Sequence, residues 1–154
     1  MKVAFVRHLG LPDRVYVQRD DGTECDWSFP SYGDGLPHDL VHLVAEKHLG
    51  LSRGFWGLVA MGIDFSRVNQ AASVAGGPLA EKYAALGPLD ELMLAELVAN
   101  LPWGQEWFDE VLETNREFQE LPPRAELDAI AAKLAPLRAR WAALDPKGAL
   151  HLEW

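Results

Sequence analysis

The hydrophobic pattern of this chain changes its period after about residue 30, and this change limits the folds that the sequence can adopt. Over residues 2–29 apolar and polar side chains alternate, which is typical of β-strands, whereas residues 36–144 have the apolar spacing of helices. Strands followed by a run of helices predict an α+β domain, with helices packed on one face of a small antiparallel sheet. The length of 154 residues suits one domain, so we expect residues 1–154 to form a single α+β domain.

The motif Asp20-Asp21-Gly22 predicts a β-hairpin, because Asp and Gly tolerate the positive φ angles of a tight turn. A two-residue loop would mix apolar and polar side chains on one face of the hairpin. A three-residue loop with Gly22 left-handed places Val17 opposite Cys25 and makes one face consistently apolar. We therefore expect the three-residue loop, with the other face of the hairpin in contact with water.

A fourth strand is predicted near the C-terminus, after the turn at Pro146-Lys147-Gly148. Its apolar side needs partners, and the N-terminal strands are the available ones, so the two ends of the chain should meet in one sheet. The first strand is apolar on both sides, which predicts a central strand covered on both faces. The predicted strands are residues 2–7, 14–18, 24–29 and 149–154.

At least five helices are expected between the hairpin and the last strand, in segments separated by Gly and Pro. Ser52 is a candidate cap for the second segment, and Pro136 should kink or divide the last one because proline lacks the N–H group that a helix interior uses. In Gly54-Phe55-Trp56-Gly57 the aromatic residues should fill the core while the glycines let another helix approach closely. The predicted segments are residues 37–48, 52–61, 64–74, 89–100, 105–121 and 124–144.

Composition excludes several classes of function. With 14 Lys and Arg against 23 Asp and Glu, the net charge of −9 disfavours nucleic acid and anionic membranes as partners. No apolar run approaches the length of a membrane-spanning helix and the N-terminus lacks a signal-peptide pattern, so we expect a cytoplasmic protein. Because Cys25 is the single cysteine, a metal would have to be held mainly by His and carboxylate groups.

One predicted helix carries a group of side chains that can bind metal. His38, Asp39, His42 and Glu46 fall within an arc of about 100° on a helix, so they share one face. Two histidines at positions i and i+4 can present their ring nitrogens to one ion, and a carboxylate one turn later can add an oxygen ligand. The alternative is a solvated helix face on which these side chains only bond to neighbours.

His38-Asp39-Leu40-Val41-His42 resembles the HExxH zinc helix of the zincin metallopeptidases. The resemblance implies that His38 and His42 bind zinc and that the residue after the first His acts as general base. Asp39 occupies that position in place of Glu and has a shorter side chain, which argues against proteolysis. His48 takes the place of the third His in the longer metzincin pattern, but it points about 120° away from His42 on a continuous helix and is not counted as a ligand.

Two further resemblances were considered. His8, the His38-Asp39 doublet and Asp64 or Asp90 can be aligned with the metal ligands of HD-domain phosphohydrolases, although that family is all-helical and this chain is not. Most of the chain is also similar to a family of small uncharacterised bacterial proteins, for which no activity is known. That second resemblance lies in Leu36-Pro37-His38-Asp39-Leu40 with His42, in Gly54-Phe55-Trp56-Gly57 and in Pro146-Lys147-Gly148.

Glu96 is the first candidate for completing a metal site. In the predicted helix 89–100 it lies close to the apolar side rather than the outward side, and a half-buried carboxylate needs a partner. The runner-up is Asp34, which stands just before the His38 helix and is also suited to a turn or a helix cap. Trp103 and Trp107 flank Gly104 and could line a pocket or an interface.

Two hypotheses of function follow. In the first, His38 and His42 hold a divalent metal, Zn or Mn, Glu46 or Glu96 completes the ligands, and Asp39 orients a ligand or a water in a hydrolase-like site. In the second, the protein is a non-enzymatic interaction module that binds a protein partner or a second copy of itself, and its histidines have no special role.

Overall fold

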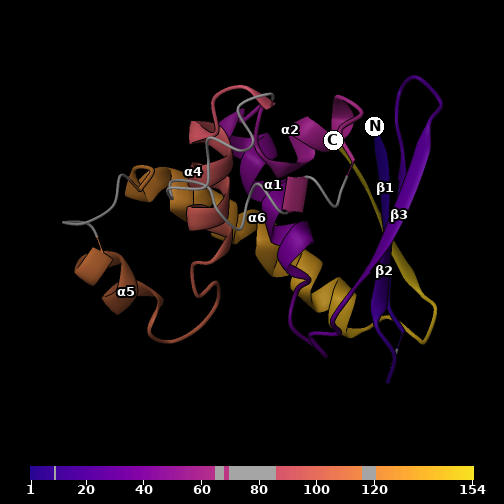
Figure 1. Cartoon of the computed structure of the whole chain (residues 1–154). Helices are drawn as coiled ribbons and strands as arrows, with labels where there is room; N and C mark the ends of the chain where they lie inside the picture. The colour runs from indigo at the N-terminus through magenta and orange to yellow at the C-terminus, as the bar shows by residue number, and fades with distance from the viewer. Residues whose placement is uncertain (9, 65–67, 70–85, 116–120) are drawn as a thin grey trace.

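Four strands form one antiparallel sheet in the order β3-β2-β1-β4 in the computed structural model, which describes residues 1–8, 10–64, 68–69, 86–115 and 121–154. Strand β1 (Lys2–Val6) pairs with both β2 (Asp13–Gln18) and β4 (Ala149–Glu153), while β3 (Glu24–Phe29) lies at the far edge. Figure 1 shows the two ends of the chain close together beside this sheet. The predicted four-stranded sheet that joins the N- and C-terminal strands is confirmed.

The predicted register of the hairpin is also confirmed. Val17 lies opposite Cys25 and Val15 opposite Trp27, and Gly22 adopts the left-handed φ of 84°. The amide of Arg19 donates to the carbonyl of Thr23, so the loop has three residues. As a result, the apolar side chains of both strands lie on one face, where they join the hydrophobic core.

All helices of the described part of the chain lie on one side of the sheet, in a second layer (Figure 1). The expected cover on both faces of the first strand was wrong, because Ala4 and Val6 on its second face are partly exposed. An antiparallel sheet can leave one face to water in this way. The helices are α1 (His38–Leu49), α2 (Phe55–Ala60), α4 (Asp90–Ala99), α5 (Phe108–Asn115) and α6 (Arg124–Ala142).

Several helix bounds differ from those predicted. Helix α2 begins after Gly54, and Ser52 does not cap it. Helix α6 continues through Pro136 and is not divided. Most of the predicted helix 64–74 and the end of the predicted helix 105–121 lie outside the described residues. No helix in the described part of the chain has both the length and the apolarity that a membrane crossing needs.

Helix α1 is the centre of the helical layer and contacts α2, α4 and α6. Every residue from Leu40 to Glu46 is buried, on all sides of the helix. The core beneath it is aromatic: the Trp56 ring of α2 lies 5.6 Å from Trp27 and 6.0 Å from Phe5, between centroids. Polar groups on α1 are therefore forced to find partners inside the protein.

Candidate metal centre

The histidine face of α1 packs against α4 and α2 and buries His42 and Glu46, so the alternative of a solvated helix face was wrong. The side chain of His42 is 1% exposed and that of Glu46 is fully buried, whereas His38, nearer the start of the helix, is 31% exposed. Helix α4 packs on α1 and supplies the third polar group, Glu96, whose side chain is 25% exposed. Each of these groups must therefore be paired with another polar atom or with an ion.

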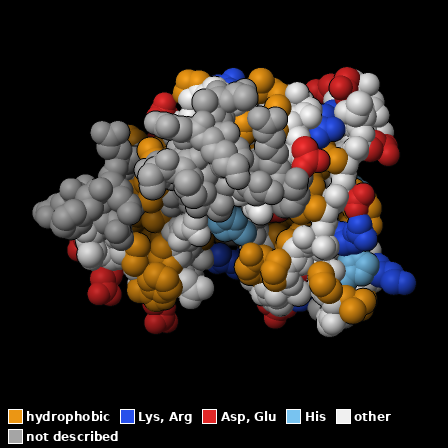
Figure 2. All heavy atoms as spheres, in the orientation of Figure 1, with side chains coloured by type: hydrophobic (Ala, Val, Ile, Leu, Met, Phe, Trp, Pro, Cys, Tyr) orange, Lys and Arg blue, Asp and Glu red, His pale blue; other side chains and the backbone are white. Residues whose placement is uncertain are grey.

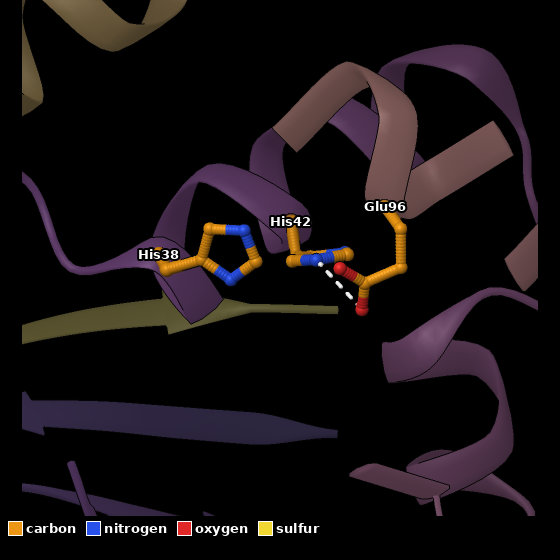
Figure 3. A group of neighbouring side chains, drawn as sticks. All are labelled: His38, His42 and Glu96. Atoms are coloured by element: carbon orange, nitrogen blue, oxygen red, sulfur yellow. Dashed lines mark ion pairs between the residues drawn. The ribbon is translucent and has the colours of Figure 1, made fainter. Parts of the chain in front are cut away.

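His38, His42 and Glu96 lie close together and form the converging group, and in Figure 3 the His42 ring lies between the other two side chains. One ligand atom from each residue lies within 4.8 Å of the others, and the Nε2 atom of His42 lies 3.4 Å from Oε1 of Glu96. The 3.4 Å distance is roughly the edge of a tetrahedron around a zinc ion with ligand distances of about 2.1 Å, whereas a separation of 4.8 Å is longer and would have to shorten when an ion binds. Among the described residues these three are the one group of His, Cys, Asp or Glu that could hold an ion.

Two ring nitrogens in this cluster have no hydrogen-bond partner. The Nε2 atoms of His38 and His42 are both buried, and no partner for either is found in the described part of the chain. A buried polar atom without a partner costs about 1–3 kcal/mol, so it is rare in a stable fold. An ion between the two rings would satisfy both nitrogens.

Glu46 lies on the other side of the His42 ring. Its Oε1 atom is 2.9 Å from Nδ1 of His42, and its two oxygens also accept the backbone N–H groups of Phe55 and Trp56 at 3.1 and 2.9 Å. With three donors around it, the carboxylate holds the proton of His42 on Nδ1. Nε2 faces Glu96, and once its own proton is displaced its lone pair can bind a metal, an arrangement that is typical of metal-binding histidines. The structure thus places Glu46 behind the His42 ring and outside the converging group.

Gly54 makes room for this buried carboxylate. A Cβ atom at position 54 would lie 2.6 Å from Cδ of Glu46 and even closer to its Oε2 atom. The close approach expected at this glycine therefore involves the side chain of Glu46 on α1. Sequence reasoning did not connect Gly54 with the candidate metal ligands, although the glycine stands directly before α2.

Asp39 faces the sheet instead of the converging group. Its Oδ2 atom accepts a hydrogen bond of 2.8 Å from the Trp27 indole of β3, and its Oδ1 atom lies 4.0 Å from Nδ1 of His38. Its backbone carbonyl accepts a second indole N–H, from Trp56, at 2.7 Å. The Asp39 side chain is thus held by Trp27 of β3 and lies next to His38.

The electrostatics of the site distinguish its two histidines. Burial lowers the pKa of His38, and the charge of His42 lowers it further, so His38 is neutral and free to bind a metal. Burial acts to lower the pKa of His42 as well, but the carboxylates of Glu46 and Glu96, which lie 2.9 and 3.4 Å from its ring nitrogens, outweigh it and raise this pKa to about 9. Without metal, His42 is therefore an imidazolium at neutral pH.

The carboxyl groups also differ among themselves. Burial acts to raise the pKa of Glu96, but the charged ring of His42, 3.4 Å away, prevails and lowers it. Burial raises the pKa of Asp39 and of Glu46, although the donors around Glu46 favour its ionised form. Of the carboxyl groups of Asp39, Glu46 and Glu96, that of Glu96 is therefore the most fully ionised, and it lies nearest to Nε2 of His42.

The remaining predicted candidates lie elsewhere. Asp34 pairs with Arg7 at 2.6 Å, and His48 pairs with Glu126 at 2.8 Å. The converging group contains none of the residues that the HD-domain alignment adds, namely His8, Asp64 and Asp90. The side chain of Asn100, the residue that follows α4, lies beside His38 and Glu96.

Comparisons with known proteins give no match of any kind. No family model matches the chain, and no curated protein and no solved structure is significantly similar to it. The resemblances noted in the sequence stay predictions, and any function has to be argued from the site itself.

Proposed function

We propose that this protein binds one divalent metal ion through His38, His42 and Glu96 and uses it for hydrolytic chemistry. The observation that carries the proposal is that one ring nitrogen each of His38 and His42 lies within 4.8 Å of the other and of a Glu96 oxygen, in a cluster whose Nε2 atoms are buried. Two imidazoles and one carboxylate are a ligand set of catalytic zinc sites, which keep a fourth position open for water. Zinc is the first choice for such a set, and manganese the second, because imidazole suits zinc better.

A bound ion of this kind lowers the pKa of its water and polarises a carbonyl or phosphoryl oxygen. The residues of the chain have separate tasks around it. Glu46 holds His42 in the tautomer that presents Nε2, and Asp39 lies beside Nδ1 of His38, where it can orient that ring. We therefore assign Asp39 a positioning role through His38 in place of the general-base role that the zincin resemblance implies.

The alternative is a non-enzymatic interaction module in which the cluster serves only the fold. One observation favours it: a charged His42 lies between Glu46 at 2.9 Å and Glu96 at 3.4 Å, and such an arrangement is also a buried ion-pair network. In that case metal would neither bind at a fixed ratio nor stabilise the protein.

Metal content and thermal unfolding separate the two functions. We expect tag-free protein to bind one zinc ion per chain and its melting temperature to rise by about 5 °C or more with added zinc. His38→Gln and Glu96→Gln, both at partly exposed positions, should abolish the increase. The matched controls are Asp90→Asn on the same helix α4 and His151→Ala on β4, which should retain it. A wild-type protein that gains no stability from zinc or manganese would contradict the proposal.

A further inference from the structure

A pocket of about 640 Å³ opens beside the proposed metal centre, and His38 forms part of its wall. The pocket lies between the start of α1, the end of α4, α6 and the loop that connects α4 with α5. Its volume is within the usual range for small-molecule sites, and its lining is mainly apolar and aromatic. Tyr32, Trp103 and Trp107 are among the lining residues.

Aromatic side chains are unusually exposed at this pocket. Trp107 is 50% exposed and Tyr32 47%, and they are two of the few large hydrophobic residues that reach the surface in the described part of the chain. Figure 2 shows hydrophobic side chains gathered over α5 and the loop before it. Exposed aromatic residues around a concave surface are typical of a binding site for a flat apolar group.

Arg138 of α6 supplies a positive charge to this apolar wall. Its guanidinium donates a hydrogen bond of 2.5 Å to the carbonyl of Trp103, and it packs directly over Gly104, where a Cβ atom would overlap Nη1. Gly104 has a left-handed φ of 73°, so both the turn and the arginine depend on this glycine. The guanidinium is therefore held in place before any ligand arrives.

No carboxylate of the described residues pairs with Arg138, although the chain has a net charge of −9. Arg138 is also the one Lys or Arg among the described residues that line the pocket. A single guanidinium can neutralise a monoanion such as a carboxylate, whereas a phosphate dianion would keep an excess of negative charge in an acidic protein.

We propose that this pocket binds a small aromatic carboxylate, with its ring between the exposed aromatic side chains, its charge on Arg138 and its body against His38. The ligand is then the substrate class of the metal centre, and this last step rests on the proposed function. The binding of the carboxylate itself needs no metal.

The test titrates the full-length protein with N-acetylphenylalanine and reads the fluorescence of its tryptophans or the heat of binding. We expect saturable binding below about 10 mM, and binding at least about tenfold weaker for N-acetylphenylalanine amide, which lacks the charge. Arg138→Gln, which keeps a donor for the Trp103 carbonyl, should weaken the acid about tenfold, and Trp107→Ala should weaken it too. Arg140→Gln on the same helix is the matched control and should bind like wild type.

Three results would contradict the proposal that the pocket binds an aromatic carboxylate. These are no saturable binding of the acid, equal affinity for the acid and its amide, or an unchanged affinity for the acid in Arg138→Gln. Tighter binding of phenyl phosphate than of the acid would overturn the choice of a carboxylate. The failure of the metal centre has a different signature: a wild-type protein that binds the acid but gains no stability from zinc or manganese would refute the metal centre alone. A protein that binds zinc but not the acid would refute the pocket alone.

Discussion

Oε1 of Glu46 lies 2.9 Å from Nδ1 of His42, the ring nitrogen that does not face Glu96. The carboxylate therefore acts on the cluster through the histidine ring, by fixing its tautomer and its orientation. This relationship, and the contacts around it, lead to five predictions.

Glu46→Gln should weaken zinc binding without removing a ligand. Loss of a carboxylate behind a metal-binding histidine typically lowers metal affinity about 10- to 100-fold, because the ring becomes less basic and less firmly held. A competition titration with a zinc chelator measures the change, and the ratio of one ion per chain should persist. An unchanged affinity would show that Glu46 has no influence on the metal.

Gly54→Ala should destabilise the protein by about 1–3 kcal/mol, because the new methyl group overlaps the Glu46 carboxylate. Chemical denaturation measures this loss. The control is a double-mutant cycle with Glu46→Ala, in which the alanine at position 54 should cost much less once the carboxylate is gone. Additive costs would mean that Gly54 serves another contact.

Zinc affinity should increase with pH up to about pH 9. In the metal-free protein the pKa of His42 is raised to about 9, so zinc has to displace a proton from Nε2 below that pH. The apparent affinity should therefore rise about tenfold per pH unit between about pH 7 and 9. Calorimetry in buffers of different ionisation enthalpy should register the released proton, and a pH-independent affinity would argue against His42 as a ligand.

The stability of the metal-free protein should change with pH in the opposite direction. Because folding raises the pKa of His42 above its ordinary value of 6.5, the imidazolium stabilises the fold fully below that value. This contribution is lost as the pH rises through about 9. Urea unfolding of chelator-treated protein should show the decline, and His42→Gln, which is neutral at every pH, should show a smaller one. Equal profiles would refute the charged state of His42.

Asp39→Asn should leave zinc binding at one ion per chain, since Asp39 lies outside the converging group. The variant weakens the hydrogen bond from the Trp27 indole and should cost about 1 kcal/mol of stability. If Asp39 positions His38, zinc affinity falls only slightly, and a hydrolytic rate measured with a model ester falls more. Complete loss of zinc in this variant would place Asp39 among the ligands.

The parts of the fold that follow local rules could be predicted from the sequence. The hairpin register depends on the turn at Gly22 and on the alternation of its neighbours, and both are visible within a dozen residues. Glu96 was found because its position on its helix marked it as half-buried, and the structure brings it to 3.4 Å from His42.

Features that depend on tertiary packing could not be predicted from the sequence. Glu46 shares a helix face with His42, but the N–H groups of Phe55 and Trp56 draw its carboxylate away from the cluster, and the position of α2 is not encoded locally. The same holds for Asp39, which is held by an indole from a strand twelve residues earlier. Helical periodicity indicates which side chains share a face and leaves open what packs against that face.

The pairing of β1 with β4 has a consequence for how the molecule assembles. Val6 lies opposite Ala149, so this half of the sheet joins segments from opposite ends of the sequence. Pairing strands that are so far apart in the sequence costs loop-closure entropy. Folds with many such long-range pairings fold slowly. We expect the hairpin to form early on its own, and the edge of β1 to stay open until the helical layer has brought the final strand alongside.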